Sequence, residues 1–297
     1  MVRTLYATIV AVAAALFFSA AQPGFAQGGR GGDAAAARAA EMQARIKEAA
    51  SAPTPKTADG RPDLSGYWTN AAGGGDPFGS APPKLAADGK TQVLALPTVA
   101  AVNANDVASA ARRKQNVALR PVYKPEYAKK AEYYFDRGDL DDPAYRCSSP
   151  GVPRIGAPSE IVTTPTAVYL LYDNQNRYRV IPTDGRKHDP NAESMPNGDA
   201  VGRWEGDTLV VDVTNLDDST WLDKDGTYHS KDMHVVERYQ RVGNTLKYDV
   251  AVEDPYFVKP FSMPTRTLIA GKSGEHVRED YPCVERSLDH MLSGEKH

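Results

Sequence analysis

The fold is decided by two stretches of sequence, VGRWEGDTLVVDVTNL at residues 201–216 and MHVVERYQRVGNTLKYDVAVE at residues 233–253. In each stretch, apolar and polar residues alternate on either side of a two-residue turn, Gly206-Asp207 in the first and Gly243-Asn244 in the second. This pattern is typical of a β-hairpin. The predicted strands are 200–205, 208–214, 233–242 and 245–252.

From residue 148 onward the rest of the sequence also predicts strands. They are expected at 161–164, 167–173, 177–182, 264–270 and 276–281. About nine strands joined by short links are the signature of an antiparallel meander. We expect a mainly β fold, first a lipocalin-like (calycin) barrel and second a β-sandwich. The links contain no long helix, which argues against βαβ units.

The first half of the chain gives weaker patterns. Residues 1–26 resemble a secretory signal, with an early Arg3, a short apolar run and small residues before a cleavage site near Ala26. An Ala-rich helix capped by Asp33 is predicted over 33–51, and a second helix over 125–136. Between them, 71–122 reads as an irregular wrapping segment with a marginal helix at 107–119. The predicted organisation is signal 1–26, linker 27–60, irregular segment 61–146, β domain 147–284 and tail 285–297.

Charge and cysteine content narrow the class of protein. The net charge is −3 and the basic residues are dispersed, so a nucleic-acid partner is not expected. No stretch after the signal is apolar enough to cross a membrane. The two cysteines, Cys147 and Cys283, bracket the β region. In an exported chain they predict one disulfide, and two buried free thiols are the alternative.

Several motifs resemble those of a large group of exported bacterial proteins of unassigned function. The motifs are KTADGRPDLSGYW at 56–68, VGRWEGDTLVV at 201–211, and HVVERY at 234–239 followed by Glu253-Asp254-Pro255. The resemblance implies export and a β-rich fold. It does not identify any catalytic residue. Phe261 departs from it, since a Trp is expected there. Gly66-Tyr67-Trp68 also resembles the opening strand of calycin barrels, where the Trp plugs one end. A Trp that anchors the surface is the alternative.

Glu237 is the first candidate for a functional residue. It shares a strand face with Met233, Val235 and Tyr239, and a charge on a core-facing position is costly unless it is paired or used. It is either a general acid or base with a pKa raised by burial, or half of an ion pair with an Arg such as Arg266. Tyr239 and Tyr248 are expected in the interior beside a ligand. Glu279 raises the same question more weakly, and the two carboxylates are a candidate acid/base pair if both point inward.

Histidines are the next candidates. His188 lies in a turn-rich loop with Asp184 and Arg186, and loops at a barrel mouth often hold ligand contacts. A solvated loop is the alternative. His229 is a candidate partner of Glu237 in proton transfer. His229, His234 and Glu237 together suggest a metal site, but a spacing of five residues points the two histidines to opposite sides of a strand. No metal is therefore predicted.

Trp221 is an aromatic residue in a polar loop at 215–226. It is expected to cover a pocket or stack on a ligand, and packing onto the barrel rim is the alternative. Asp217, Asp223 and Asp225 of the same loop do not have the spacing of an EF-hand, so solvated turn residues are expected.

Motifs of several enzyme classes are absent from the sequence, including the nucleophile elbow, the zinc-protease helix, the phosphate loop and the dinucleotide fingerprint. We expect an exported, cofactor-independent acid/base enzyme of the lyase, isomerase, hydratase or cyclase type. Its substrate would be a small organic molecule, aromatic or sugar-like ones included, held in a barrel pocket. The first alternative is a non-catalytic lipocalin-like binding protein for an apolar or aromatic ligand. The second is an envelope protein whose segment 71–122 binds a partner.

Overall fold

The computed structural model describes residues 29–71, 84–85, 92–93, 120–137, 141–173, 176–223 and 225–279. The chain has two compact units, Met1–Ala40 and Glu41–His297. The second unit contains all the strands described below. Within the described residues, no helix has the length and apolarity needed to cross a membrane.

Antiparallel strands dominate the second unit. Nine of them form one continuous path in the order β6-β5-β4-β1-β12-β10-β9-β8-β7, and the short β11 pairs with β10. The strands of this sheet are β1 (Gly66–Asn70), β4 (Glu160–Thr163), β5 (Ala167–Tyr172), β6 (Arg177–Pro182), β7 (Asp199–Glu205), β8 (Thr208–Thr214), β9 (His234–Val242), β10 (Thr245–Glu253), β11 (Phe261–Ser262) and β12 (Arg266–Ala270). A separate pair joins β2 (Lys84–Leu85) to β3 (Gln92–Val93).

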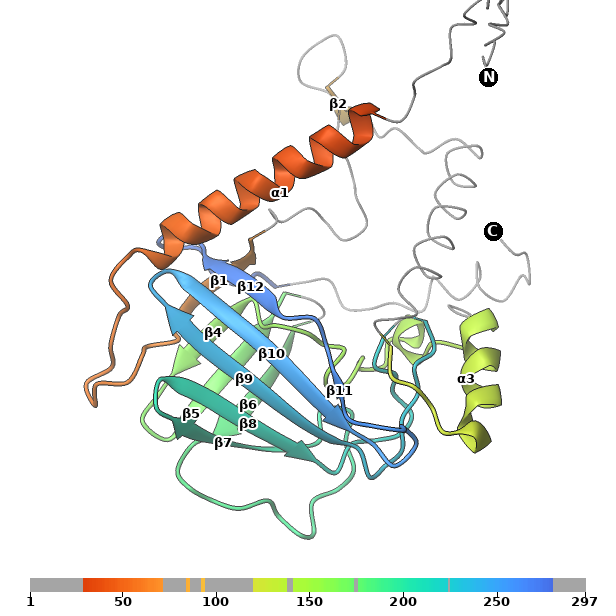
Figure 1. Cartoon of the computed structure of the whole chain (residues 1–297). Helices are drawn as coiled ribbons and strands as arrows, with labels where there is room; N and C mark the ends of the chain where they lie inside the picture. Colours follow the sequence, from red (N-terminus) through yellow and green to blue (C-terminus); the bar gives the residue numbers. More distant parts are fainter. Residues whose placement is uncertain are drawn as a thin grey trace, which may run out of the picture. The chain divides into compact units, whose positions relative to one another are not determined.

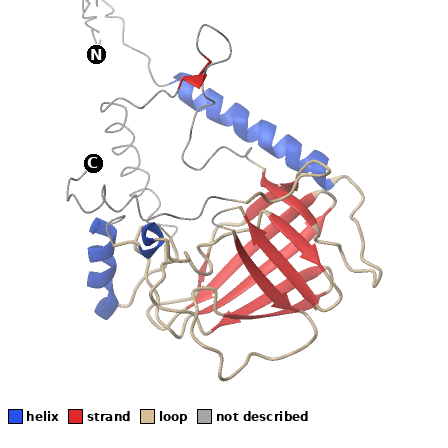
Figure 2. Ribbon diagram, turned by 180° about the vertical axis from the view of Figure 1, so that it is seen from behind, coloured by secondary structure: helices blue, strands red, loops and turns tan. Residues whose placement is uncertain are grey.

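The large sheet curves round into a nearly closed barrel, as both views of the ribbon show (Figures 1 and 2). Consecutive strands pair within two runs, β4-β5-β6 and β7-β8-β9-β10, and β1 joins the runs by pairing with β4 on one side and with β12 on the other. This is the meander predicted from the two hairpins and their short links. The mainly β class and the barrel are thus confirmed, in preference to a sandwich.

The barrel has one seam without a hydrogen-bonded ladder, between β6 and β7. A closed ring of nine strands cannot have every neighbour antiparallel, because nine is odd. All ladders along the path are antiparallel, so its two end strands run in the same direction. They still approach closely, since a β-carbon added to Gly202 of β7 would lie 2.8 Å from Ile181 of β6. Gly202 therefore allows the seam to close by packing.

One end of the barrel is closed by Trp68. Its side chain is buried, and its indole Nε1 donates to the Leu64 carbonyl oxygen at 3.0 Å. The guanidinium of Arg241 lies 4.9 Å from the ring centroid and donates to the carbonyl oxygens of Asp63 and Ser65. Trp68 is thus an end plug rather than a surface anchor. It belongs to β1, so the barrel includes a strand that precedes the β domain expected at 147–284.

Two helices have bounds near those predicted. Helix α1 spans Gly29–Ala50, so Asp33 lies inside the helix and the capping role predicted for it is wrong. The end of α1 contacts the β9–β10 turn, where Asn244 N donates to Ala49 O at 2.8 Å. Helix α3 spans Pro125–Arg137 and begins at the expected proline. Its Tyr127 stacks on Tyr256, with ring centroids 4.0 Å apart.

The remaining sequence predictions have mixed outcomes. Residues 276–279 are described and form no strand, so the strand expected at 276–281 is wrong for that part. The predicted signal at 1–26, the marginal helix at 107–119, residues 280–281 and the tail lie outside the described residues. So does Cys283, and its pairing with Cys147 stays a prediction. Cys147 itself caps the short 3-10 helix η3 (Pro143–Arg146) with φ of 59°.

Candidate functional site

Glu237 lies sealed inside the barrel, in a cluster that satisfies its carboxylate. Arg179 of β6 donates two hydrogen bonds to it, from Nη1 to Oε1 at 3.0 Å and from Nη2 to Oε2 at 2.6 Å. The hydroxyls of Tyr239 and Tyr248 donate to Oε1 at 3.0 and 2.7 Å. Glu237 is 0% and Arg179 4% exposed. A substrate therefore has no access to this carboxylate in the folded barrel.

The pKa values in this cluster agree with a structural role. Burial raises the pKa of the Tyr239 and Tyr248 hydroxyls well above their usual value, and the Glu237 charge adds to the effect. Burial also raises the pKa of Tyr172 to about 12. Both tyrosines that contact Glu237 thus stay neutral donors. Of the two uses proposed for Glu237, the structure supports the ion pair, but its partner is Arg179. Arg266 is exposed on β12, so the pairing predicted for it is wrong.

The residues expected to act with Glu237 lie in separate places. His229 is buried in the loop before β9, where its Nδ1 donates to Ser230 O and its Nε2 accepts from Thr220 Oγ1, both at 2.8 Å. Glu279 is exposed beside a different pocket, so the condition for an inward-pointing pair with Glu237 is not met. His188 lies on the outer wall of the barrel. The acid/base group predicted from the sequence is therefore not assembled.

The predicted ligand contacts are also dispersed. Trp221 is buried against Tyr134 of α3, with ring centroids 5.1 Å apart, so it packs inside the protein, and the contact given for it is with a helix rather than with the barrel rim. Asp184 and Arg186 are exposed and paired with each other, Nη2 to Oδ2 at 2.6 Å. Hydrogen bonds from Arg186 lower the pKa of Asp184 to about 2. Tyr239 and Tyr248 point inward as expected, toward Glu237 rather than a ligand.

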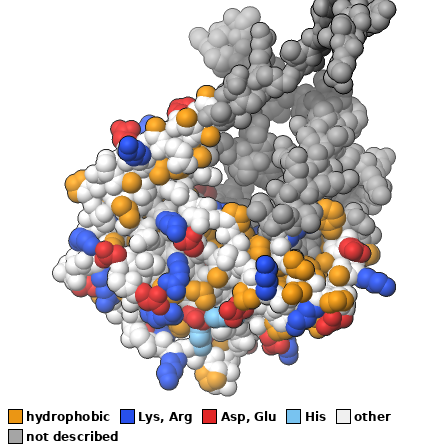
Figure 3. Space-filling model, in the orientation of Figure 1, with side chains coloured by type: hydrophobic (Ala, Val, Ile, Leu, Met, Phe, Trp, Pro, Cys, Tyr) orange, Lys and Arg blue, Asp and Glu red, His pale blue; other side chains and the backbone are white. Residues whose placement is uncertain are grey.

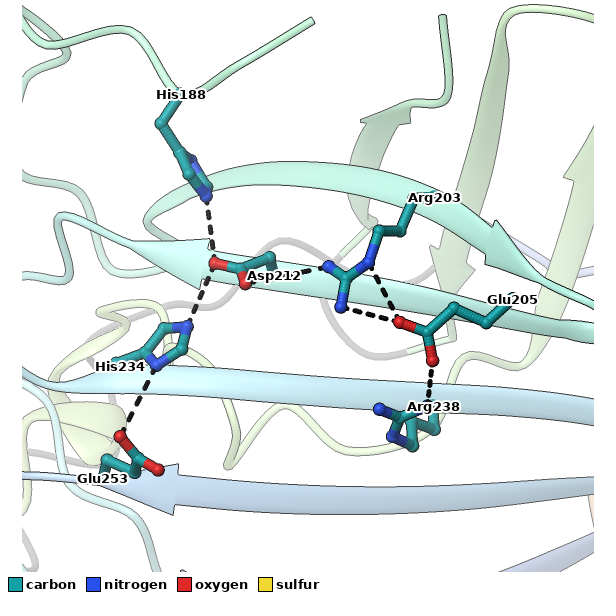
Figure 4. A network of polar contacts seen from close by, with 7 residues as sticks. All are labelled: His188, Arg203, Glu205, Asp212, His234, Arg238 and Glu253. Atoms are coloured by element: carbon teal, nitrogen blue, oxygen red, sulfur yellow. Dashed lines mark hydrogen bonds and ion pairs between the residues drawn. The ribbon is translucent and has the colours of Figure 1, made fainter. Parts of the chain in front are cut away.

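A second polar cluster, on the outer face of β7, β8 and β9, has the accessibility that the interior lacks (Figure 4). Asp212 is its centre. It points outward because Val211 and Val213, its neighbours on β8, point into the core. His234 points outward on β9 for the same reason, between Met233 and Val235. Because Asp212 pairs with Val236, His234 lies diagonally across from it, within reach of a carboxylate.

Two imidazoles share one oxygen of Asp212. Nε2 of His234 and Nε2 of His188 each lie 3.0 Å from Asp212 Oδ1. The other nitrogen of His188, Nδ1, lies 2.8 Å from Asp199 Oδ2, so the ring joins two carboxylates. Both contacts of His188 are hydrogen bonds only when both of its nitrogens carry hydrogen, because a carboxylate only accepts. His188 thereby fixes the crossover loop at 183–198 onto the wall.

The electrostatics keep Asp212 ionised. Burial alone raises the pKa of Asp212, but hydrogen bonds from His188 and His234 outweigh burial, and the pKa is lowered from 3.8. Arg203 Nη1 adds a weaker contact, 3.9 Å from Oδ2. The ionised Asp212 accepts a hydrogen bond from His234 Nε2, and this fixes the neutral tautomer of His234 with its lone pair on Nδ1.

His234 also faces a pocket of about 430 Å³. The only carboxylate recorded near its Nδ1 is Glu253 of β10, with Oε2 4.0 Å away, so this nitrogen is not closed off by a direct hydrogen bond among the described residues. The other residues that line the pocket are Asp232, Asp254, Pro255, Phe257, Val258, Lys259 and Pro260. Histidine and acidic side chains lie together at the surface on this side of the molecule (Figure 3). His234 thus has one nitrogen held by a carboxylate and the other open to a cavity.

The metal site considered for His229, His234 and Glu237 does not form, because one residue is in a buried loop, one on the outer wall and one inside the barrel. Within the described part of the chain, no group of three or more His, Cys, Asp or Glu side chains is arranged to hold a metal ion.

Fold and site together define a nearly closed antiparallel barrel with a carboxylate–imidazole pair on its outer wall. Comparison of the chain with family models, with curated proteins and with solved structures gives no match. The chemistry of the site must therefore be inferred from its own geometry.

Proposed function

We propose that the protein is an acid/base enzyme that acts on a small organic molecule without a cofactor, and that His234 transfers the proton. The observation that carries the proposal is the position of this imidazole between a fixed carboxylate and a cavity. Nε2 is held 3.0 Å from Asp212 Oδ1, and the same ring lines the 430 Å³ pocket. An oriented base beside a cavity is the minimum requirement for general acid/base catalysis.

In this proposal Nδ1 of neutral His234 removes a proton from the substrate, and Asp212 stabilises the imidazolium that forms. The imidazolium then returns the proton at another atom, as a lyase, isomerase, hydratase or cyclase requires. Asp212 acts through His234 and is a positioning residue. His188, held by Asp199, keeps Asp212 in place from the other side.

The pocket lining limits the substrate. Phe257 and Val258 provide an apolar surface, whereas Asp232, Glu253 and Asp254 outnumber the single cation, Lys259. This excess of negative charge favours neutral or cationic substrates over anions. The expected signal sequence would place the enzyme in the periplasm or outside the cell.

The test uses 5-nitrobenzisoxazole, a neutral planar probe of accessible bases. A base removes its C3 proton as the ring N–O bond breaks, which yields a nitrile and a coloured phenolate without any co-reactant. We expect His234→Gln to lower the protein-dependent rate by about 10²-fold, the usual contribution of a positioned base.

His276→Gln is the matched control, because His276 also contacts a carboxylate, Glu160, at 2.7 Å and lines a different pocket. It should keep the wild-type rate. An unchanged rate in His234→Gln, or a loss confined to His276→Gln, would overturn the proposal.

A further inference from the structure

We infer that a second pocket, at the barrel end closed by Trp68, binds a neutral planar aromatic molecule that carries one hydroxyl or carbonyl group. The pocket has a volume of about 350 Å³, within the range of small-molecule sites. Three segments form it: the turn at 57–63, the β4–β5 turn at 163–165, and Trp204 near the end of β7. It shares no lining residue with the His234 pocket, so the inference is independent of the proposed enzyme.

The walls of this pocket are fixed by contacts that need no ligand. Thr57 N donates to Arg61 O at 2.9 Å, which closes the first turn. Lys56 Nζ lies 3.3 Å from Asp207 Oδ1 and ties the same turn to the β7–β8 hairpin. On the other side, Thr163 N donates to Ser65 Oγ at 3.0 Å. A preformed cavity loses little conformational entropy when a ligand enters.

The lining favours an aromatic ligand without a net charge. Trp204 is half-buried against the core and offers an indole ring to the cavity. The Arg61 guanidinium lies 5.7 Å from the centroid of that ring, and its Nε is 3.2 Å from Asp59 Oδ2. Asp63 adds a second carboxylate. Trp204 is the aromatic surface of this pocket on which a planar ligand can stack, whereas the two carboxylates oppose an anionic ligand.

A hydroxyl group at the pocket wall indicates a polar substituent on the ligand. Thr163 Oγ1 is buried and has no hydrogen-bond partner within the described residues. A buried hydroxyl without a partner destabilises the protein until a hydrogen-bond acceptor or donor reaches it. Rotation about Cα–Cβ exchanges the hydroxyl with the methyl group, so Thr163 can turn toward a ligand oxygen in the pocket that it lines.

Equilibrium dialysis with 2-naphthol and naphthalene tests both parts of the inference, because the two probes share a ring system and differ in one hydroxyl. The fluorescence of each probe reports its concentration on both sides of the membrane. The wild-type protein should bind 2-naphthol at least about tenfold more tightly than naphthalene, the ratio expected for a hydrogen bond that removes an unsatisfied group.

Trp204→Ala should weaken the binding of both probes at least about tenfold, since it removes the stacking surface. Thr163→Val has nearly the same shape, and it should remove only the preference for 2-naphthol. Tyr178→Ala, which removes an exposed aromatic ring on the outer face of β6, is the control and should change neither affinity. The inference would be overturned if the wild-type protein bound the two probes with equal affinity. It would also be overturned if Trp204→Ala bound either probe as tightly as the wild-type protein does.

Discussion

Arg179 and Glu237 form a two-hydrogen-bond ion pair across the interior of the barrel, with Arg179 Nη2 2.6 Å from Glu237 Oε2. Arg179 belongs to β6 and Glu237 to β9, on opposite sides of the seam that lacks a ladder. The pair therefore links, through side chains, two parts of the sheet that backbone hydrogen bonds do not join directly. The stability of the barrel, rather than its chemistry, depends on it.

Replacement of Glu237 by Gln should destabilise the fold strongly. The substitution leaves the Arg179 charge buried without its counter-charge, and breaking a buried pair in this way costs about 3–5 kcal/mol. Urea unfolding should show this loss as a lower midpoint with an unchanged slope. A loss below about 1 kcal/mol, typical of exposed pairs, would contradict the structural role.

A double variant separates the charge from the packing. Arg179→Met with Glu237→Met removes both charges and keeps apolar volume, and such replacements are often neutral or stabilising. The Tyr239 and Tyr248 hydroxyls then lose their acceptor, which costs about 1–3 kcal/mol each. The double variant should still lose no more free energy of unfolding than the two single variants, Arg179→Met and Glu237→Met, lose together. A larger loss in the double variant would show that the two residues do not stabilise each other.

His229 should make the fold sensitive to mild acid. Burial lowers its pKa from 6.5, and in the unfolded chain it titrates near that ordinary value. Below pH 6.5 the unfolded chain therefore binds more protons than the folded chain, so stability is lost as the pH falls below that value. His229→Asn should flatten the loss measured by urea unfolding at several pH values. The exposed His276→Asn should leave it unchanged; an identical effect of both variants would argue against the assignment.

Gly243 should tolerate no side chain, whereas Gly206 should tolerate one at moderate cost. Both have a positive φ, 58° and 59°, so Ala strains the backbone at either position. A β-carbon on Gly206 meets nothing within 4 Å, but on Gly243 it would lie 2.7 Å from the carbonyl oxygens of Ala49, Ala50 and Ala52. Gly206→Ala should cost about 1–2 kcal/mol. Gly243→Ala should cost clearly more in the same unfolding assay, and equal costs would contradict the contact with the end of α1.

The strands were predictable from sequence wherever local turn chemistry sets them. Gly206-Asp207 and Gly243-Asn244 mark their hairpins, and the strands on either side have the predicted bounds to within about two residues. The barrel followed from the number of strands and their short links. The missing ladder between β6 and β7 could not be predicted, because the number of strands fixes their directions but not whether two parallel neighbours form hydrogen bonds.

Strand β6 shows why the sequence alone does not identify the partner of Glu237. Its sequence, RYRVIP, has Tyr178 and Val180 on one face and Arg179 and Ile181 on the other. Alternation alone does not say which face is the core. In the structure Tyr178 is 64% and Val180 43% exposed, whereas Arg179 points inward. The buried carboxylate of Glu237, on another strand, reverses the usual preference for burying the more apolar face. No local pattern in β6 indicates this.

The outer-wall site was only partly visible in the sequence. The sequence indicates His188 and His234 as candidates, but it does not indicate Asp199 or Asp212. Asp212 is the only charged residue in an otherwise apolar and Thr-containing strand, and this was the available signal. Its contact with His234 depends on the register between β8 and β9, and a long loop separates these two strands in the sequence. Its contact with His188 depends on the path of the crossover loop.

Replacement of Asp212 by Asn should change the pH dependence of the proposed reaction as well as its rate. Loss of the carboxylate removes a charge that favours the imidazolium form, so the rising limb of the pH–rate profile should move to lower pH. The rate with 5-nitrobenzisoxazole at the plateau should also fall, because the base is no longer oriented. A lower rate with an unmoved profile would indicate a structural effect of Asp212 alone.

The central claim is that proton transfer belongs to the outer wall at His234 and stability to the interior at Glu237. The most direct measurement compares His234→Gln and Glu237→Gln side by side, for melting temperature and for the rate of 5-nitrobenzisoxazole cleavage per folded molecule. We predict that His234→Gln loses the rate and keeps the melting temperature, and that Glu237→Gln lowers the melting temperature and keeps the rate. The opposite result, with activity lost in Glu237→Gln at an unchanged melting temperature, would contradict the account.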